Sequence, residues 1–411
     1  MIGKSNSDVA NKQRILLLVD DYLPSSSKVA AKMCHELAQE LIRMGHNVIV
    51  VTPEPSLNTA STLEVFEGVQ VLRFKTGKLK GAGKVRRALN ETVLSWRAWR
   101  GINSKLKKQD IDAVVYYSPS IFWGPLVKKL KAQHKCKTYL ILRDFFPQWA
   151  IDEKIIRAGS PIEKYFRYFE AQTYRAADTI GVMSENNLAL FKASHNTSAT
   201  VEVLRNWAAI GEKIAPEKHV SVRAKLNLEN KVIFFYGGNI GVAQDMANLM
   251  RLARSLRHRS EAHFLFVGAG DEVELVKKLA RDWDLQNFTY LPSIQQAAFD
   301  SLLSEVDVGL FTLSKNHTTH NFPGKLLGYM AHAKPILGSV NKDNDLMPLL
   351  NGMGAGFVRL NGDDEELYRA AEQLLDSSEL RKEQGINGLQ LLRDEFSVES
   401  IAQQILARTG G

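Results

Sequence analysis

Short apolar runs alternate with amphipathic segments along most of the chain. The run Arg14–Val19 is almost wholly aliphatic, as is typical of a strand in the buried centre of a parallel sheet. In the following stretch, Val29–Leu41, apolar residues recur every four positions and indicate a helix. Gly45 ends that helix, and Val48–Val51 is the next apolar run. The order predicts a strand, a crossover helix and a second, parallel strand.

The same alternation continues through the first half of the chain and restarts in the second half. We expect further strands at Val69–Phe74, Ala113–Tyr117, Thr138–Leu142, Val232–Tyr236, His263–Val267, Phe288–Leu291, Val308–Thr312 and Pro335–Leu337. A polar stretch at 211–231 separates the two series. The pattern predicts two doubly wound α/β domains. We assign residues 1–207 to the first and 208–392 to the second, and expect 393–411 to form a helix that can return to the N-terminal domain.

The composition fits a globular protein with two cores. The chain has 411 residues, of which 45% are hydrophobic and 24% charged, and this excludes disordered and collagen-like classes. Two cysteines, Cys34 and Cys136, cannot make a disulfide framework and fit a reducing compartment. No apolar run approaches the ~18 residues that a membrane helix needs, and the polar N-terminus lacks the apolar core of a signal peptide. We therefore expect a cytosolic protein, which can still lie on a membrane.

Positive charge is concentrated in one segment. Between Arg73 and Lys108 there are twelve Lys/Arg residues and one acid, so this segment carries +11 while the whole chain carries +8. Apolar residues recur every three or four positions from Val85, which predicts a basic helix with tryptophan in its apolar stripe. Such a helix is typical of a membrane surface, although its stripe can equally pack on the domain core. The candidate acceptor and membrane residues are Lys84, Arg86, Arg87, Trp96, Arg97, Trp99 and Arg100.

Two glycine turns of the second domain are candidate phosphate sites. One is Gly237-Gly238-Asn239-Ile240-Gly241 and the other is Gly268-Ala269-Gly270-Asp271, and each follows an expected strand. Glycine lets the backbone approach an anion, and a following helix presents free N–H groups. A third element, Pro323-Gly324-Lys325, precedes an expected helix at Leu326–Ala331. A lysine in a first turn opposes the helix dipole by ~0.3–1 kcal/mol unless an anion lies there. A tight turn and a solvated lysine are the alternative readings.

Several other classes of site do not fit the spacing. The first strand is followed by Asp20-Asp21-Tyr22-Leu23-Pro24, which has no dinucleotide-binding glycines. In Gly77–Val85, Val85 stands where a P-loop needs serine or threonine. His317 and His320 come without a nearby cysteine or carboxylate motif, so we expect no metal site. The basic segment lacks any known nucleic-acid recognition motif, and we expect no nucleic-acid partner.

The order of motifs resembles the family-4 glycosyltransferases of the GT-B fold, in particular the bacterial O-antigen and capsule branch and its N-acetylfucosamine-type transferases. The resemblance covers nearly the whole chain. It rests on Gly45-His46-Asn47-Val48, Arg143-Asp144-Phe145-Phe146-Pro147, Arg205-Asn206-Trp207, Gly238-Asn239-Ile240-Gly241, Pro323-Gly324-Lys325, Tyr329-Met330-Ala331 and Lys334-Pro335. It implies two Rossmann-like domains that face a cleft.

The resemblance also implies roles for individual residues. Gly238, Asn239 and Gly241 would face the diphosphate of a nucleotide sugar, with Pro323, Gly324 and Lys325 beside it, and Gly268 and Gly270 would shape the nucleoside pocket. Lys325 would pair with the diphosphate, and no metal or other cofactor would be needed. Asp144 would orient or deprotonate the acceptor hydroxyl. Helix capping is the alternative role for Asp144.

The family's paired glutamates are missing from this chain. Their positions hold His320 and Gly328, which leaves the ribose contacts unexplained. The resemblance still implies a retaining transferase on the inner face of the bacterial plasma membrane. It would move a sugar, expected to be a UDP-linked N-acetylated deoxysugar, to a polyprenyl-diphosphate-linked glycan. The alternatives are a GT-B sugar-nucleotide epimerase and a non-catalytic subunit that binds a sugar nucleotide or lipid.

Overall fold

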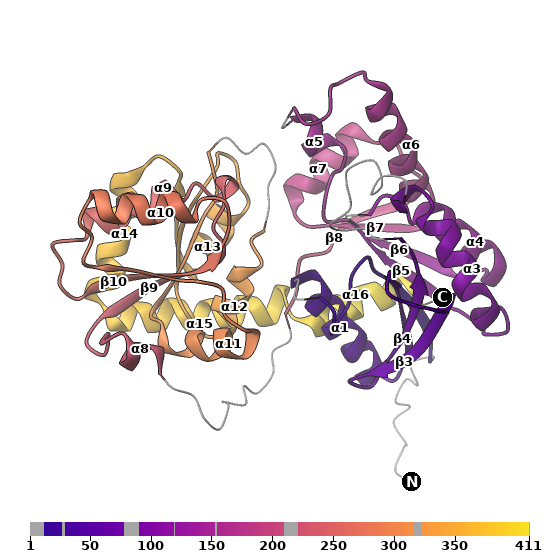
Figure 1. Cartoon of the computed structure of the whole chain (residues 1–411), viewed down its shortest axis with the longest axis horizontal. Helices are drawn as coiled ribbons and strands as arrows, with labels where there is room; N and C mark the ends of the chain where they lie inside the picture. The colour runs from indigo at the N-terminus through magenta and orange to yellow at the C-terminus, as the bar shows by residue number, and fades with distance from the viewer. Residues whose placement is uncertain are drawn as a thin grey trace, which may run out of the picture. The chain divides into compact units, whose positions relative to one another are not determined.

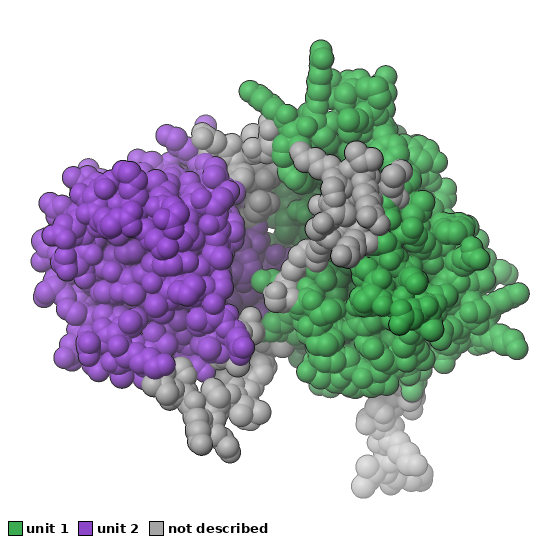
Figure 2. Space-filling model, in the orientation of Figure 1, with its two compact units in different colours: residues 1–205, 398–411 green, residues 206–397 purple. Residues whose placement is uncertain are grey.

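The computed structural model describes residues 12–26, 29–77, 90–118, 120–152, 154–208, 221–315 and 322–410. These residues form two compact units (Figure 2). Unit 1 comprises residues 1–205 and 398–411, and unit 2 comprises residues 206–397. Each unit is an α/β body built on one sheet (Figure 1).

Unit 1 contains an eight-stranded sheet in the order β3-β4-β2-β1-β5-β6-β7-β8. All neighbours pair in parallel except β3 and β4, which are antiparallel. The strands are β1 (Arg14–Leu18), β2 (Asn47–Glu54), β3 (Ser61–Phe66), β4 (Val69–Lys75), β5 (Ala113–Tyr117), β6 (Lys137–Ile141), β7 (Thr179–Val182) and β8 (Thr200–Val203). The helices are α1 (Val29–Arg43), α3 (Leu94–Leu106), α4 (Gly124–His134), α5 (Gln148–Asp152), α6 (Pro161–Arg175), α7 (Glu185–Ser194) and α16 (Val398–Thr409).

Both faces of this sheet are buried, which explains its continuous apolar strands. Leu16 and Leu18 of β1 share a core cluster with the apolar residues of α3 and α4. The intervening residues Ile15 and Leu17 are also fully buried. Helix α1 packs against α16, and the two contact β2 and β6 respectively. The last helix of the chain therefore completes unit 1.

Unit 2 contains a six-stranded, fully parallel sheet in the order β11-β10-β9-β12-β13-β14. Its strands are β9 (Val232–Asn239), β10 (Ala262–Ala269), β11 (Phe288–Leu291), β12 (Val308–Thr312), β13 (Ile336–Val340) and β14 (Gly356–Leu360). Its helices are α8 (Val222–Lys225), the 3₁₀ turn η1 (Val242–Gln244), α9 (Met246–Ser255), α10 (Val273–Asp282), α11 (Gln296–Glu305), α12 (Lys325–Ala331), α13 (Leu346–Gly352), α14 (Asp364–Asp376) and α15 (Ser378–Glu395).

The helices of unit 2 divide between the two faces of its sheet. Alternate residues of β9 serve different cores: Phe235 packs with α11, α12, α13 and α15, whereas Phe234 and Tyr236 pack with α9, α10 and α14. Because β9 and β10 pair in parallel, the turns that follow them lie at the same carboxyl edge of the sheet. In an open parallel sheet that edge is where ligands collect.

The predicted strands are present, with ends shifted by up to three residues, but β3, β7, β8 and β14 were not predicted. Strand β3 lies at a sheet edge and exposes Leu63 and Val65, so it lacks a continuous apolar run. It joins β4 through Glu67 and Gly68, both with positive φ (45° and 82°), as a two-residue hairpin requires. Edge position, where burial is incomplete, weakens the sequence signal of a strand.

Candidate functional site

The two glycine turns of unit 2 lie against each other. Strands β9 and β10 pair in register, with Gly238 opposite Gly268. A Cβ atom on Gly268 would lie 1.8 Å from the carbonyl oxygen of Gly238, and one on Gly270 would lie 2.0 Å from that of Ile240. No side chain fits at such distances. Both of these glycines belong to the second turn, which therefore needs glycine because its backbone closely approaches that of the first turn, in addition to any role with a ligand.

Lys325 lies over the first of these turns. A Cβ atom on Gly238 would lie 3.8 Å from its Cε and 3.9 Å from its Nζ. The same Nζ lies 3.4 Å from the centre of the Tyr236 ring. A cation on an aromatic face in a water-poor site gains roughly 2 kcal/mol, so this contact fixes the position of the ammonium group. The structure thus places Pro323-Gly324-Lys325, the third candidate element, beside the first glycine turn.

Tyr329 holds helix α12, and with it Lys325, against β9. Its hydroxyl accepts a hydrogen bond from the backbone N–H of Gly237 (3.3 Å) and donates one to the carbonyl of Leu310 (3.0 Å). Its ring fills the space that a side chain at Gly309 would need, since a Cβ there would lie 2.4 Å from the ring. Lys325 is therefore carried on a helix anchored to two central strands.

The electrostatics of Lys325 favour an anionic ligand. Burial lowers the pKa of its amine well below the ordinary value. Within the part of the chain that the structure describes, no carboxylate forms an ion pair with it. A buried cation without a counter-charge is destabilising until an anion arrives. A diphosphate at the Gly238 turn would supply that anion.

The segment after the first glycine turn differs from the expectation. We expected a helix that begins directly after the turn with free N–H groups, but the 3₁₀ turn η1 intervenes and α9 begins at Met246. The backbone N–H of Met246 donates to Oε2 of Glu272 (3.2 Å), and the amide of Asn239 donates to Oε1 of Gln244 (2.7 Å). A carboxylate from the protein already occupies this helix start. Recognition of an anion therefore depends on Lys325 and the turn backbone.

Two observations bear on the missing ribose contacts. A Cβ atom at Gly328 would lie 3.3 Å from Cδ1 of Leu303, so a glutamate there would require Leu303 to shift. The sequence gave Asp271 no role beyond its place at the end of the second turn, but its Oδ1 lies 2.9 Å from the position that a Cβ on Gly241 would take. A carboxylate beside the first turn suits hydroxyl donors of a ribose better than a phosphate. The proximity of Asp271 to the first turn arises from the packing of the two turns and could not be predicted from the sequence.

Asp144 lies at the carboxyl edge of unit 1, just after β6. Its side chain is exposed by surface area, yet the protein around its carboxyl disfavours the charged form and raises its pKa, opposed by the charge of Arg143. The alternative capping role is not observed, because Asp144 makes no hydrogen bond to the described residues, α5 included. The neighbouring strand β5 ends at Tyr117, and the buried Oγ of the next residue, Ser118, also has no partner in the described chain. Both groups are available to an acceptor hydroxyl.

The basic helix differs in phase from the prediction. Helix α3 begins at Leu94, after a turn at Val93, and its buried residues at four-residue spacing are Leu94, Ala98, Ile102 and Leu106. We placed Trp96 and Trp99 in one apolar stripe, which was expected to face a membrane surface or to pack on the domain core. Trp96 is instead 55% exposed and carries Arg100 over its ring (5.4 Å to the centroid), whereas Trp99 is half-buried beneath Lys129 (5.3 Å). Trp99 packs against the core cluster of unit 1, and Ile102 and Leu106 of the predicted stripe are buried, so the stripe packs on the core except at Trp96.

Some sequence candidates lie outside the described residues. These are Lys84, Arg86, Arg87, His317 and His320. Among the residues that the structure does describe, no group of three or more His, Cys, Asp or Glu side chains could hold a metal ion. Within the same residues, no helix is both long and apolar enough to cross a bilayer.

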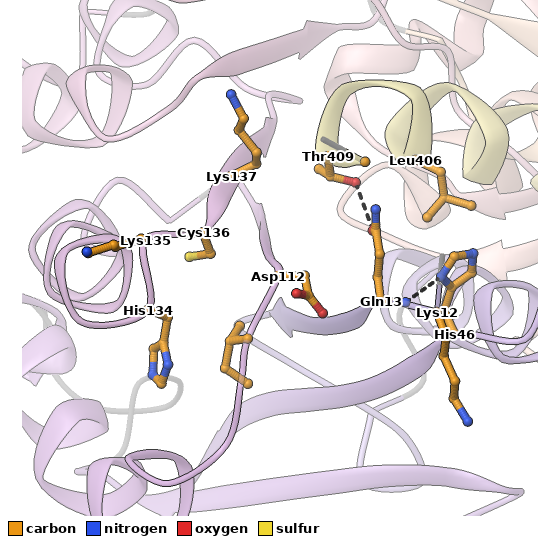
Figure 3. Close-up of a pocket in the computed structure, with 12 residues that line it drawn as sticks. Lys12, Gln13, His46, Asp112, His134, Lys135, Cys136, Lys137, Leu406 and Thr409 are labelled. Carbon is orange, nitrogen blue, oxygen red and sulfur yellow. Dashed lines mark hydrogen bonds between the residues drawn. The ribbon is translucent and has the colours of Figure 1, made fainter. Parts of the chain in front are cut away.

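A cavity of about 590 Å³ lies at the opposite, amino-terminal edge of the unit 1 sheet (Figure 3). It is bordered by the residues that precede β1, β2, β5 and β6 and by the end of α16. Thr409 Oγ1 donates to Gln13 Oε1 (3.4 Å), and Gln13 N–H donates to His46 Nδ1 (3.2 Å). In Figure 3, Lys135 and Lys137 point away from the centre. The cavity joins α16 to the sheet and offers no convergent set of charges.

Two family models match the chain. Residues 30–208 match Glycosyltransferase Family 4, and residues 230–377 match Glycosyl transferases group 1. A probable glycosyltransferase WbjE of Pseudomonas aeruginosa is 26% identical over 247 residues, or 59% of this chain and 62% of the relative. The match thus spans less than two thirds of that relative. A putative colanic acid biosynthesis glycosyl transferase, WcaI of Escherichia coli K12, is 22% identical over 77% of this chain and 81% of its own length.

Solved structures share the fold over nearly the whole chain. Sucrose-phosphate synthase from Thermosynechococcus elongatus superposes with a TM-score of 0.72 at 15% identity, covering 96% of this chain and 97% of that one. Anabaena HepE in complex with UDP gives 0.68 at 14% identity, covering 96% and 99%. These likenesses establish the GT-B fold with two Rossmann-like α/β units.

Proposed function

Because the chain carries a glycosyltransferase family 4 domain followed by a glycosyl transferases group 1 domain, we propose that it is a retaining glycosyltransferase of bacterial surface-polysaccharide assembly. Unit 2 would hold the nucleotide-sugar donor, and unit 1 would hold the acceptor. The observation that carries the proposal is the placement of Lys325. It is a partly buried cation without an ion-pair partner in the described chain, and it lies over the first of two glycine turns whose backbones touch.

The proposed reaction breaks the bond between the anomeric carbon of the donor and the diphosphate. The acceptor hydroxyl oxygen forms the new bond to that carbon on the same face and loses its proton. The leaving diphosphate gains negative charge, which Lys325 would stabilise in a site with little water. Asp144 would orient the acceptor hydroxyl or accept its proton, for which its burial-raised pKa makes it a stronger base. No metal or cofactor is assigned a role in this proposal.

The proposed donor is a UDP-linked, N-acetylated deoxysugar, as in the N-acetylfucosamine-type transferases that the sequence resembles. HepE, a protein of the same fold, has been solved with UDP. The proposed acceptor is a polyprenyl-diphosphate-linked glycan of an O-antigen or capsule. Such an acceptor is held in the inner leaflet, so we propose that the protein acts peripherally on the cytoplasmic face. The cationic, tryptophan-bearing surface of α3 supports that location.

Calorimetry tests the donor half of the proposal. The full chain is titrated with UDP, GDP and UDP-N-acetylhexosamines in the presence of EDTA. We expect selective binding of UDP and of one UDP-sugar. Failure of every nucleotide to bind a demonstrably folded sample would refute the proposal.

A transfer assay with a polyprenyl-diphosphate-linked sugar tests the acceptor half, and NMR of the product reports the anomeric configuration. We expect a product with the configuration of the donor. Conversion of the UDP-sugar without any acceptor would favour the epimerase. Binding of nucleotide without turnover of any donor would favour the non-catalytic subunit.

A further inference from the structure

A second cavity lies in unit 1, where the end of β4 meets α3. Its volume is about 320 Å³. We name it the β4–α3 pocket, and its lining residues are Ala60, Lys75, Thr76, Gly77, Trp96, Arg97, Arg100 and Gly101. It contains three cations, one exposed indole and no carboxylate. None of the residues in the glycine-turn site of unit 2 belongs to it.

Among the residues that the structure describes, the three cations of the pocket have no counter-charge. Arg97 donates to the amide oxygen of Asn90 (3.0 Å), and Arg100 lies over the Trp96 ring. Neither arginine, nor Lys75, forms an ion pair with a carboxylate of the described chain. Three like charges around one cavity repel one another, and a bound anion would remove that repulsion.

The walls of the pocket are held in place before any ligand binds. The Ser61 hydroxyl donates to the carbonyl of Gly101 on α3 (2.6 Å). A Cβ atom on Gly101 would lie 3.0 Å from both the carbonyl oxygen of Ala60 and Cβ of Phe74, so α3 packs closely on β3 and β4. Thr76 is 6% exposed, and its Oγ1 has no hydrogen-bond partner in the described chain. Such a buried, unpartnered hydroxyl is destabilising unless a ligand or water satisfies it.

We propose that the β4–α3 pocket binds the phosphate group of an amphiphile, with Arg97 and Arg100 on the phosphate and Trp96 on the adjoining apolar part. Guanidinium groups match phosphate with two parallel hydrogen bonds. An exposed indole beside cations suits the boundary between headgroups and acyl chains. The inference rests on the proposed membrane-side role of unit 1 and adds a defined lipid contact to it. A soluble phosphate ester is the other source of the same chemistry.

Vesicle sedimentation of the full-length protein tests the pocket. Phosphatidylcholine vesicles with and without phosphatidylglycerol are compared for the wild type and for the double variant Arg97→Gln/Arg100→Gln. Each cation near an anionic surface contributes about a factor of five in affinity, so the double variant should bind anionic vesicles about thirtyfold more weakly. The matched control is Arg254→Gln, because Arg254 lies over Trp283 (5.0 Å) on unit 2 in the same kind of stacked pair. The control should bind like the wild type.

Soluble competitors identify the source of the phosphate. If glycerol 3-phosphate or inorganic phosphate displaces the protein from vesicles in the wild type only, the pocket binds phosphate as proposed and a soluble ester suffices. If neither competes while the double variant still loses binding, the lipid itself is the ligand. Equal vesicle binding by wild type and double variant, with no effect of either competitor, would overturn the proposal.

A nucleotide titration of the same variants keeps this outcome separate from the proposed function. The double variant should bind UDP as the wild type does, since Lys325 and the glycine turns are intact. If the double variant binds vesicles normally while Lys325→Ala loses nucleotide, only the pocket assignment fails. A variant with Thr76→Val provides a second probe, with weaker phosphate binding expected and the surface cations unchanged.

Discussion

The replacement Lys325→Met is expected to weaken UDP binding about thirtyfold. The side chain of methionine keeps apolar bulk over the Tyr236 ring while removing the charge. Nζ lies 3.9 Å from the position of a Cβ on Gly238, so a phosphate oxygen received by this turn comes to ~4 Å from it. At that distance one pair of charges attracts by ~4 kcal/mol at an effective dielectric constant of 20.

Only part of that attraction appears as affinity. The ammonium group has already lost much of its contact with water in the free protein. The cost of its desolvation therefore lowers the stability of the fold and does not reduce the free energy of binding. The diphosphate must still leave water, and hydrogen bonds to charged groups contribute ~1.5–3 kcal/mol net. About 2 kcal/mol remains, which corresponds to about thirtyfold in Kd.

Calorimetry in two buffers with different ionisation enthalpies, repeated over a range of pH, measures both the affinity and proton uptake. Burial lowers the pKa of Lys325 and an arriving diphosphate would raise it again, so binding should be accompanied by proton uptake between the two pKa values. The wild type should take up protons on binding, and Lys325→Met should not.

The control for this measurement is Lys334→Met. Burial also lowers the pKa of Lys334, but its Nζ donates to the carbonyl of Ser304 (3.0 Å), and it stands beyond the end of α12. It should leave both the affinity and the proton uptake unchanged. Binding by Lys325→Met within twofold of the wild type, with the same proton uptake, would refute the reasoning.

Three further predictions concern stability and catalysis. Lys325→Met should raise the melting temperature of the free protein, because the unfolded chain binds a proton that the folded chain disfavours. The stability of the wild type therefore rises with pH between the folded and unfolded pKa values of Lys325. The increase in melting temperature caused by the substitution should be largest on the acidic side of that range. Melting curves across pH check this, and a lower melting temperature at neutral pH would contradict it. Gly268→Ala should lower the free energy of unfolding by more than ~2 kcal/mol, because its Cβ would lie 1.8 Å from the carbonyl oxygen of Gly238. Gly352→Ala is the control, since a Cβ there would meet nothing within 4 Å and should leave the free energy of unfolding unchanged. Denaturant titrations of both variants check this. Asp144→Asn should reduce kcat by about a hundredfold or more without changing the affinity for UDP. Because burial raises the pKa of Asp144, the acid limb of the pH–rate profile of the wild type should lie above the range of an ordinary carboxyl. An unchanged kcat in Asp144→Asn would show that Asp144 has no part in the mechanism.

The fold class was readable from the sequence because parallel strands buried on both faces give unbroken apolar runs. Val232–Tyr236 and Ala113–Tyr117 stand out in this way, and both are strands. The glycine turns after β9 and β10 were readable for the same reason, since each follows such a run. The edge strand Ser61–Phe66 was missed because none of its residues is fully buried, so its sequence has no continuous apolar run.

Which side of a helix is buried was harder to predict from the sequence than where the helix lies. The segment around Trp96 was recognised as a basic helix, and Ile102 and Leu106 of its predicted stripe are buried. Trp96 is exposed, because a large indole satisfies a three-to-four-residue spacing whether it faces the core or the solvent. Packing against β3 and β4, which Gly101 permits, selected the side that Leu94 and Ile102 occupy. That choice left Trp96 exposed beside Arg97 and Arg100.

The order of the elements, the two glycine turns and the lysine of the third candidate element all follow from local sequence patterns. That these features belong to one site follows from long-range packing. Lys325 reaches Gly238 because Tyr329 ties α12 to β9, and the two turns meet because β9 and β10 pair in register. The same packing places Lys325 away from any carboxylate that could pair with it in the described chain. Because its charge has no partner there, this lysine favours a bound anion.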